Sequence, residues 1–179
     1  MSIQIALLRG INIVGRKMVP MAELRELACR LGFTGVRTLL QSGNLVLEGG
    51  RLSGAALERR LEQQTARRLC VDCDCVVRSA AEWQQIVARN PFPQEAQDDP
   101  GHLLVMLLKA TPSKDNLAAL RNSIKGPEYL HADGKQLYIV YPDGVGRSKL
   151  TSNLIERKLT TRGTARNWNT VLKLAALCR

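Results

Sequence analysis

The order of apolar and amphipathic segments in the first half of this chain is almost completely repeated in the second half. In the first half, short apolar runs predict strands at 3–8, 36–40, 45–48 and 71–77. Leucines at helical spacing after Pro20, and again after Ser53, predict a helix between the first two strands and another between the last two. The resulting order, β-α-β-β-α-β, is the split βαβ or ferredoxin-like plan.

The second half repeats most of this order. A buried strand is expected at 102–109 and a helix at 111–124. Strands at 128–132 and 136–141 are expected to form a hairpin across the turn sequence Asp133-Gly134.

Two helices are expected to complete the second half. The first runs over roughly 149–159, which gives β-α-β-β-α without a fourth strand. The second begins near "TARN", residues 164–167. Its expected apolar face consists of Trp168, Val171, Leu172 and Ala175.

Prolines concentrate between the two halves and predict a linker. Three of them fall in 90–101, directly after a short helix expected at 80–88. The predicted fold is therefore an α+β chain of two ferredoxin-like (split βαβ) subdomains with a C-terminal helical segment. The predicted boundaries are a subdomain at 1–89, a linker at 90–101 and a second subdomain at 102–179.

The composition and the length of the apolar runs indicate which class of protein this chain belongs to. Hydrophobic residues make up 45% of the chain, enough to form a core. The sequence has no apolar run long enough to cross a bilayer and no basic region ahead of an apolar run at its N-terminus, so we expect a cytoplasmic protein without a membrane partner.

Five cysteines, an odd number, argue against a disulfide framework. Cys73 and Cys75 fall two apart in an expected strand and are interpreted as small buried hydrophobes on one face. Because the two histidines show no pairing with this cluster in the sequence, we expect no metal site.

The charge of the chain is strongly asymmetric. Net charge is +10. From Arg147 onward the sequence contains eight basic residues and one acidic residue, Glu156, which gives +7 for this part. The first 146 residues hold 18 basic and 15 acidic residues, which gives +3. Such a field attracts phosphate groups of a small molecule or of a nucleic acid, although it also fits a merely solubilising surface.

Two polar loops are predicted to meet at one rim of the first subdomain. In the split βαβ plan, the ends of the first two strands, the turn after the second strand and the start of the first helix share that rim. Glycines there allow backbone N–H groups to approach an anion, arginine offers a bidentate fork, and amides orient a ligand. The simpler alternative is ordinary turn chemistry. The candidate residues are Arg9, Gly10, Asn12, Gln41, Ser42, Gly43 and Asn44.

Two further segments are candidate anion sites. In "PDGVGRSKL", a glycine-bearing loop leads into an expected helix start, with Arg147 and Lys149 beside it and Ser148 as a possible N-cap, although the Walker A spacing is absent. In "TARN", Thr164 or Asn167 is expected to cap the last helix, with Arg166 in its first turn. A cation there opposes the helix dipole, which suggests that Arg166 has a partner.

These motifs together resemble the DUF1697 family, bacterial proteins of uncharacterised function. The resemblance rests on "LRGIN", "QSGN", "YPDGVGRSKL" and "TARNWNT" in this order and covers nearly the whole chain. The family's usual second glycine in the first loop is Val14 here. The resemblance implies an α+β fold built from ferredoxin-like parts, and it implies no reaction, cofactor or catalytic residue.

Three functions fit these observations. The first is binding of an anionic, phosphate-containing ligand, either a nucleotide or a nucleic-acid backbone; base stacking is disfavoured because the central strands carry no aromatic residues. The second is an enzyme acting on a phosphorylated or anionic small molecule, although no acid–base pair stands out. The third is a structural protein whose motifs clasp the two subdomains. The sequence leaves catalysis, cofactors and oligomeric state open.

Overall fold

The computed structural model describes residues 2–12 and 18–178, so Val14 lies outside the described residues. The described chain divides into two compact units, 1–85 together with 174–179, and 86–173. The divisions fall inside two helices, α3 (Ala80–Ala88) and α7 (Trp168–Ala176). The stretch 90–101, for which a linker is predicted, contains helix α4 (Pro93–Asp98) and belongs to the second unit.

The first unit contains one four-stranded sheet. Its strands are β1 (Ile3–Leu8), β2 (Arg37–Leu39), β3 (Asn44–Glu48) and β4 (Cys75–Ser79), in the order β2-β3-β1-β4. All neighbouring strands are antiparallel, so β1 and β2 run parallel with β3 between them. This confirms the ferredoxin-like topology predicted for the first half.

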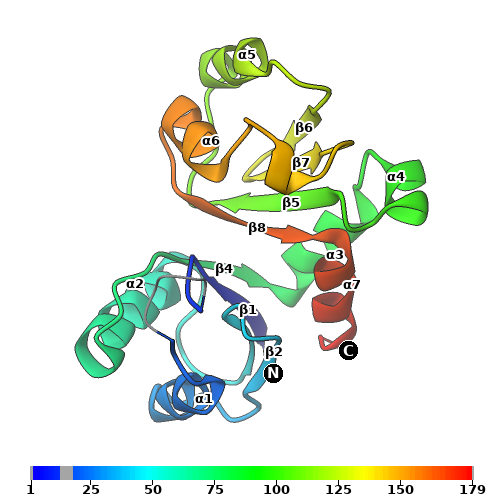
Figure 1. The fold of residues 1–179 in the computed structure, drawn as a ribbon. Coiled ribbons are helices and arrows are strands. Elements are labelled where there is room, and N and C mark those ends of the chain that lie inside the picture. Colours follow the sequence, from blue (N-terminus) through cyan, green and yellow to red (C-terminus); the bar gives the residue numbers. More distant parts are fainter. Residues whose placement is uncertain (1, 13–17, 179) are drawn as a thin grey trace. The chain divides into compact units, whose positions relative to one another are not determined.

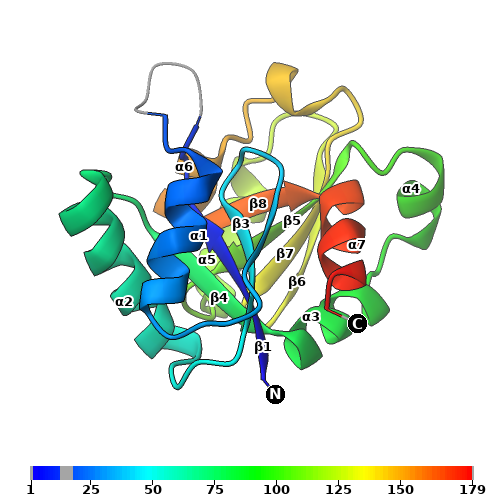
Figure 2. The same cartoon turned by 90° about the horizontal axis from the view of Figure 1, so that it is seen from below.

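Two helical segments cover one face of this sheet (Figure 1 and Figure 2). They are α1 (Met21–Arg30) and α2 (Gly54–Gln64), and α2 continues into a π-helical turn, η1 (Thr65–Leu69). Leucines at helical spacing, such as Leu24 and Leu57, are fully buried against strand residues of the same face. Cys73 and Cys75 lie in this core, as predicted, although Cys73 precedes β4.

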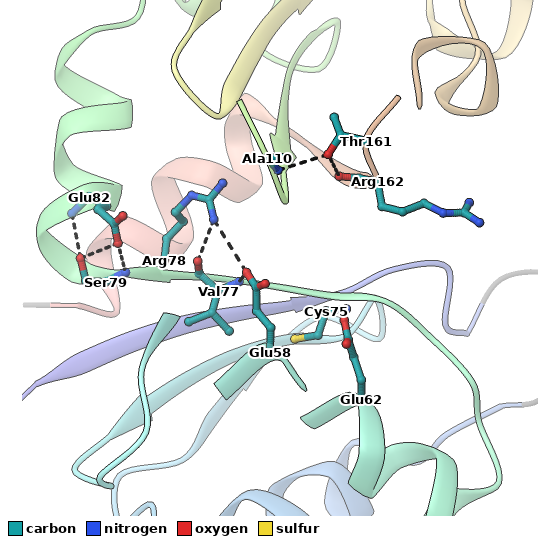
Figure 3. A network of polar contacts seen from close by, with 10 residues as sticks. All are labelled: Glu58, Glu62, Cys75, Val77, Arg78, Ser79, Glu82, Ala110, Thr161 and Arg162. Atoms are coloured by element: carbon teal, nitrogen blue, oxygen red, sulfur yellow. Dashed lines mark hydrogen bonds and ion pairs between the residues drawn. The ribbon is translucent and has the colours of Figure 1, made fainter. Parts of the chain in front are cut away.

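The outer strand β4 is joined to α2 by carboxylates as well as by apolar contacts (Figure 3). Glu58 Oε1 accepts from Val77 N at 2.9 Å, and Glu62 Oε1 accepts from Cys75 N at 2.8 Å. Ala6 faces Val77 and Leu8 faces Cys75 across the ladder as non-hydrogen-bonded pairs, because Arg9 N donates to Asp74 O. The two N–H groups therefore point away from β1 and are satisfied by α2.

The second unit repeats the topology with a second four-stranded sheet. Its strands are β5 (Leu103–Leu108), β6 (Tyr129–Asp133), β7 (Gln136–Val140) and β8 (Gly163–Asn167), in the order β6-β7-β5-β8. Helices α5 (Lys114–Ser123) and α6 (Ser152–Leu159) cover one face, and a 3-10 turn, η2 (Val145–Arg147), precedes α6. Both units are thus βαββαβ, and the predicted α+β class is confirmed.

The fourth strand of the second unit corrects the sequence prediction. Residues 164–167 were expected to open the last helix, but they lie in β8, where Arg166 pairs with Val105 of β5. The helix begins only at Trp168. Arg166 is therefore not in a helical first turn, and the argument that it opposes a helix dipole is wrong.

The buried face of α7 also differs from the prediction. Trp168, Val171 and Ala175 are buried, but Leu172 is 42% exposed and Leu174 is fully buried in its place. Within the described residues, no helix is long and apolar enough to cross a membrane.

Candidate functional site

The motifs at 9–12 and 41–44 meet at one end of the first sheet, as the topology predicts. Asn12 Nδ2 donates to Gln41 O at 2.8 Å and to Val19 O at 2.8 Å. Val19 N, just before α1, donates back to Asn12 Oδ1 at 2.5 Å. Asn12 thereby joins the end of β1, the β2–β3 turn and the approach to α1.

The β2–β3 turn directs its own polar groups inward as well. Asn44 is fully buried, and its Nδ2 donates to Leu39 O at 2.8 Å and to Ser42 Oγ at 2.9 Å. Gly43 has a φ of +72°, and a Cβ at this position would lie 2.7 Å from Ile11 Cδ1. The glycine is therefore required by backbone conformation and by close packing.

Arg9 and Gly10 mark the point where β1 ends. Arg9 is half-buried, and its N–H donates to Asp74 O at 2.8 Å. Gly10 has a φ of +64°, and the side chain of Gln41 across the rim is exposed. In this motif pair, Gln41 thus presents its side chain to solvent, whereas the amides of Asn12 and Asn44 are used within the fold.

The segment 142–150 forms a loop and not a helix start. Helix α6 begins at Ser152, with Thr151 as its N-cap: Thr151 Oγ1 accepts from Leu154 N at 3.3 Å. Ser148 is not the cap; its Oγ accepts from Leu150 N at 2.9 Å and donates to Glu128 Oε1. Arg147 and Lys149 are both exposed on this loop.

This loop forms one wall of a pocket of about 420 Å³ that lies wholly within the second unit. The opposite wall comes from the connection between α5 and β6. The lining residues are Lys125, Gly126, Pro127, Glu128, Asp143, Arg147, Ser148 and Lys149. The structure therefore combines the three predicted residues of this loop with a third cation and two carboxylates.

A buried tyrosine anchors the loop beside this pocket. Tyr141 is 3% exposed, and its hydroxyl donates to Leu150 O at 3.1 Å. Burial, reinforced by the nearby Glu128 carboxylate, raises the pKa of Tyr141 to about 12. The hydroxyl thus remains a neutral donor at physiological pH and holds the end of the loop.

Residues Arg166 and Asn167 lie outside this pocket lining. Arg166 is half-buried, and its Nη1 donates to Thr164 Oγ1 and to Ala165 O, both at 2.8 Å. Asn167 Oδ1 accepts from Thr170 N at 3.0 Å and from Thr170 Oγ1 at 2.9 Å. The predicted capping role of Asn167 is confirmed, with α7 beginning at the next residue.

The sequence prediction missed the wall formed by residues 125–128. The signal was present in "KGPE", a Gly-Pro turn flanked by a lysine and a glutamate, but its nearness to 147–149 depends on the tertiary fold. Residues 125–128 and 147–149 are joined through the hydrogen bond from Ser148 to Glu128.

Cys73 is not activated as a nucleophile. Burial raises the pKa of the Cys73 thiol, and its Sγ lies 3.7 Å from Thr65 Oγ1. A raised pKa disfavours the nucleophilic thiolate. In the part of the chain that the structure describes, no three histidine, cysteine or acidic side chains gather as metal ligands would.

Similarity to known proteins agrees with this architecture. The profile of the family described as "Protein of unknown function (DUF1697)" matches residues 1–138. The chain belongs to the DUF1697 family. Among solved structures, this DUF1697 chain is similar to the conserved bacterial protein SP0830 from Streptococcus pneumoniae, with a TM-score of 0.77, 21% identity and 99% of each chain covered. That similarity shows the fold. No curated protein matches the chain in sequence.

Proposed function

We propose that this protein binds a small, phosphate-bearing molecule in the pocket lined by residues 125–128, 143 and 147–149. The observation that carries the proposal is the gathering of Lys125, Arg147 and Lys149 around one volume of about 420 Å³. Arginine forks and lysine ammonium groups are the side chains that most often hold phosphate in proteins. The pocket also lies within the usual size range for small-molecule sites, about 300 to 1,000 Å³.

The two carboxylates of the pocket favour a ligand with hydroxyl groups. Glu128 already accepts a hydrogen bond from Ser148, and Asp143 lines the same volume. Carboxylates repel bare phosphate but accept hydrogen bonds from hydroxyls. A nucleotide or a sugar phosphate offers both groups, so either matches the mixed lining better than inorganic phosphate does.

This proposal makes no use of the motifs at 9–12 and 41–44 as ligand contacts. The amides of Asn12 and Asn44 donate to backbone carbonyls, and a ligand would have to displace those bonds. For these two side chains we propose a structural role, within the first unit.

Thermal unfolding with added ligands tests the proposal. The wild-type protein is heated with inorganic phosphate, sugar phosphates and mononucleotides at low and moderate salt. A ligand at about 100 times its dissociation constant stabilises the folded state by about 2.7 kcal/mol. We expect this stabilisation for at least one hydroxyl-bearing phosphate and its loss in the Arg147→Ala/Lys149→Ala variant.

The matched control is Lys114→Ala/Lys173→Ala, which removes the same charge from two exposed helix positions outside the pocket lining. We expect the control to respond to the ligand like the wild type. If both variants lost the stabilisation by the ligand equally, net charge alone would explain that stabilisation. Absence of any stabilising ligand in the panel would overturn the proposal.

A further inference from the structure

The segment formed by α2 and η1 carries four exposed arginines. Arg59 and Arg60 lie on α2, and Arg67 and Arg68 lie on η1. Within the described residues, no hydrogen bond or ion pair engages the side chains of Arg59, Arg60 or Arg67. Arg68 Nε donates to the buried Gln64 at 2.9 Å, a neutral partner.

The glutamates of the same segment do not neutralise these arginines. In the sequence, "ERRLEQQTARR" alternates charges in a way typical of a salt-bridged helix surface. In the structure, Glu58 is 8% exposed and accepts from Val77 N, while Glu62 accepts from Cys75 N (Figure 3). Both carboxylates therefore face β4, away from the arginines on the solvent side.

At the i,i+4 spacing, the helical neighbours of the arginines are amides in place of carboxylates, and Glu62, three residues after Arg59, accepts from Cys75 N of β4. Four residues separate Arg60 from Gln64 and Gln64 from Arg68, and the same spacing separates Arg59, Gln63 and Arg67. Residues at this spacing are the ones that meet on a helix surface. Glutamate at positions 63 and 64 would have formed ion pairs, so the glutamines leave the positive charge uncompensated.

Three of the arginines surround a single hollow. Among the described residues, a volume of about 350 Å³ is lined by Arg60, Gln64, Arg67 and Arg68 and by no acidic residue. The neighbouring hollow toward α1 contains two acidic residues, Glu23 and Glu26, beside Arg68. Glu26 there forms an ion pair with Arg30 at 2.6 Å. The positive surface is thus bounded on the α1 side.

We propose that this arginine face, defined as Arg60, Arg67 and Arg68 around Gln64, binds the phosphate backbone of a nucleic acid. Arg60 and Arg67 are seven residues apart, which is about 10 Å along a helix axis. One strand of DNA carries a phosphate about every 3.4 Å of its axis, so the face spans about three phosphates. A row of guanidinium groups matches such a repeating anion better than a single phosphate.

The same face predicts binding without base recognition. The residues that line the hollow include no aromatic ring on which a base would stack. Contacts to phosphates position a protein but carry no sequence information. This site is separate from the pocket of the second unit and does not depend on the proposed small-molecule function.

Fluorescence anisotropy against salt concentration tests this proposal. Labelled duplex DNA, single-stranded DNA and RNA of mixed sequence are titrated with wild-type protein and with Arg60→Ala/Arg67→Ala/Arg68→Ala. Each lost phosphate contact lowers the slope of log affinity against log salt by about 0.9 on duplex DNA. We expect the triple variant to lose about 2 to 3 in slope on the preferred nucleic acid.

The control removes the same charge elsewhere. Lys114→Ala/Arg121→Ala/Lys173→Ala changes three exposed positions of the second unit and is expected to leave most of the slope intact. Equal losses in the two triple variants would overturn the proposal, because net charge alone would then explain binding. So would an absence of nucleic-acid binding at low salt, or binding of polyglutamate peptide in its place.

A charge-preserving variant distinguishes the loss of positive charge from a folding defect. Arg60→Lys/Arg67→Lys/Arg68→Lys keeps the positive charge and is expected to retain the salt slope, with thermal unfolding as the check that all variants fold. If the triple alanine variant does not fold, Arg67→Ala alone is expected to lower the slope by about 1. An unchanged slope in that single variant would contradict the proposal.

Discussion

Three asparagine side chains of the predicted motifs hydrogen-bond to backbone groups. Asn12 donates to Gln41 O and Val19 O, Asn44 donates to Leu39 O, and Asn167 accepts from Thr170 N. The sequence predicted that the first two lie together and named Thr164 or Asn167 as the cap of the last helix. It left open whether the amides of Asn12 and Asn44 serve the turns or a ligand, because turn chemistry and ligand chemistry require the same residue types.

At this scale we predict that Asn44→Ala destabilises the first unit. The side chain is fully buried, and its removal deletes the hydrogen bonds that its amide donates to Leu39 O and to Ser42 Oγ. At about 0.5 to 1.5 kcal/mol for each hydrogen bond, the two together are worth about 1 to 3 kcal/mol. Urea denaturation is expected to show a loss of this size in the free energy of unfolding.

Gln41→Ala is the control within the same motif. Its side chain is exposed, and the contact with Asn12 uses only its backbone carbonyl. We expect a change of at most about 0.5 kcal/mol. Comparable losses for the two variants would contradict the assignment of Asn44 to the fold.

At the scale of elements, the segments that sequence alone predicted least well are those whose pairing partner supplies the stabilisation. Strand β8 has the sequence "GTARN", which shows no alternation of apolar and polar residues. Its ladder to the apolar β5 makes it a strand. Long apolar segments such as β1 and β5 were predicted well, because their own hydrophobic pattern determines the burial.

The buried face of helix α7 was also not determined by its sequence pattern alone. Its sequence is apolar at both 172 and 174, so spacing alone did not identify which leucine is buried. The structure exposes Leu172 and buries Leu174 completely. Of these two leucines, Leu174 therefore contributes to the packing of this helix, together with Trp168, Val171 and Ala175.

We predict unequal effects of alanine at these two positions of α7. Leu174→Ala creates a cavity in a fully buried site and is expected to lower the free energy of unfolding by about 2 to 5 kcal/mol. Leu172→Ala, in the same helix and with the same chemical change, is expected to cost less than about 1 kcal/mol. Chemical denaturation of both variants measures the difference, and a reversed order would refute the orientation of α7.

At the scale of the whole molecule, the two units match in side-chain contacts as well as in topology. By strand register, Leu8 corresponds to Leu108 and Cys75 to Gly163. Glu156 of α6 accepts from Gly163 N at 3.0 Å, as Glu62 does from Cys75 N. Three residues further along the same strands, Arg78 corresponds to Arg166, and each donates from Nη1 to the carbonyl of the preceding residue at 2.8 Å.

The tyrosines, by contrast, all lie in the second unit. Tyr138 and Tyr141 are buried, and burial raises the pKa of each from 10.0 to about 12. The unfolded chain releases these protons near pH 10, whereas the folded state holds them to about pH 12. The free energy of unfolding therefore falls as pH rises through this range, and it is unaffected by these groups below it.

We predict that the protein loses about 2 to 3 kcal/mol of stability per buried tyrosine between pH 10 and pH 12. Urea denaturation at pH 8, 10, 11 and 12 measures the loss. In Tyr141→Phe the loss with pH is expected to be smaller, after a pH-independent cost of about 1 kcal/mol for the missing hydrogen bond. The raised pKa of Cys73 affects both proteins equally. Identical pH dependence in the two proteins would contradict the prediction.

The carboxylates that reach from α2 and α6 also bear on how this protein behaves at high concentration. An edge strand with unpaired N–H groups is a template on which another chain adds a strand, and this is a common route to aggregation. Glu58, Glu62 and Glu156 occupy such donors on β4 and β8. At those positions each unit thus places a negative charge where an invading strand would have to insert its carbonyls, so strand addition is blocked there.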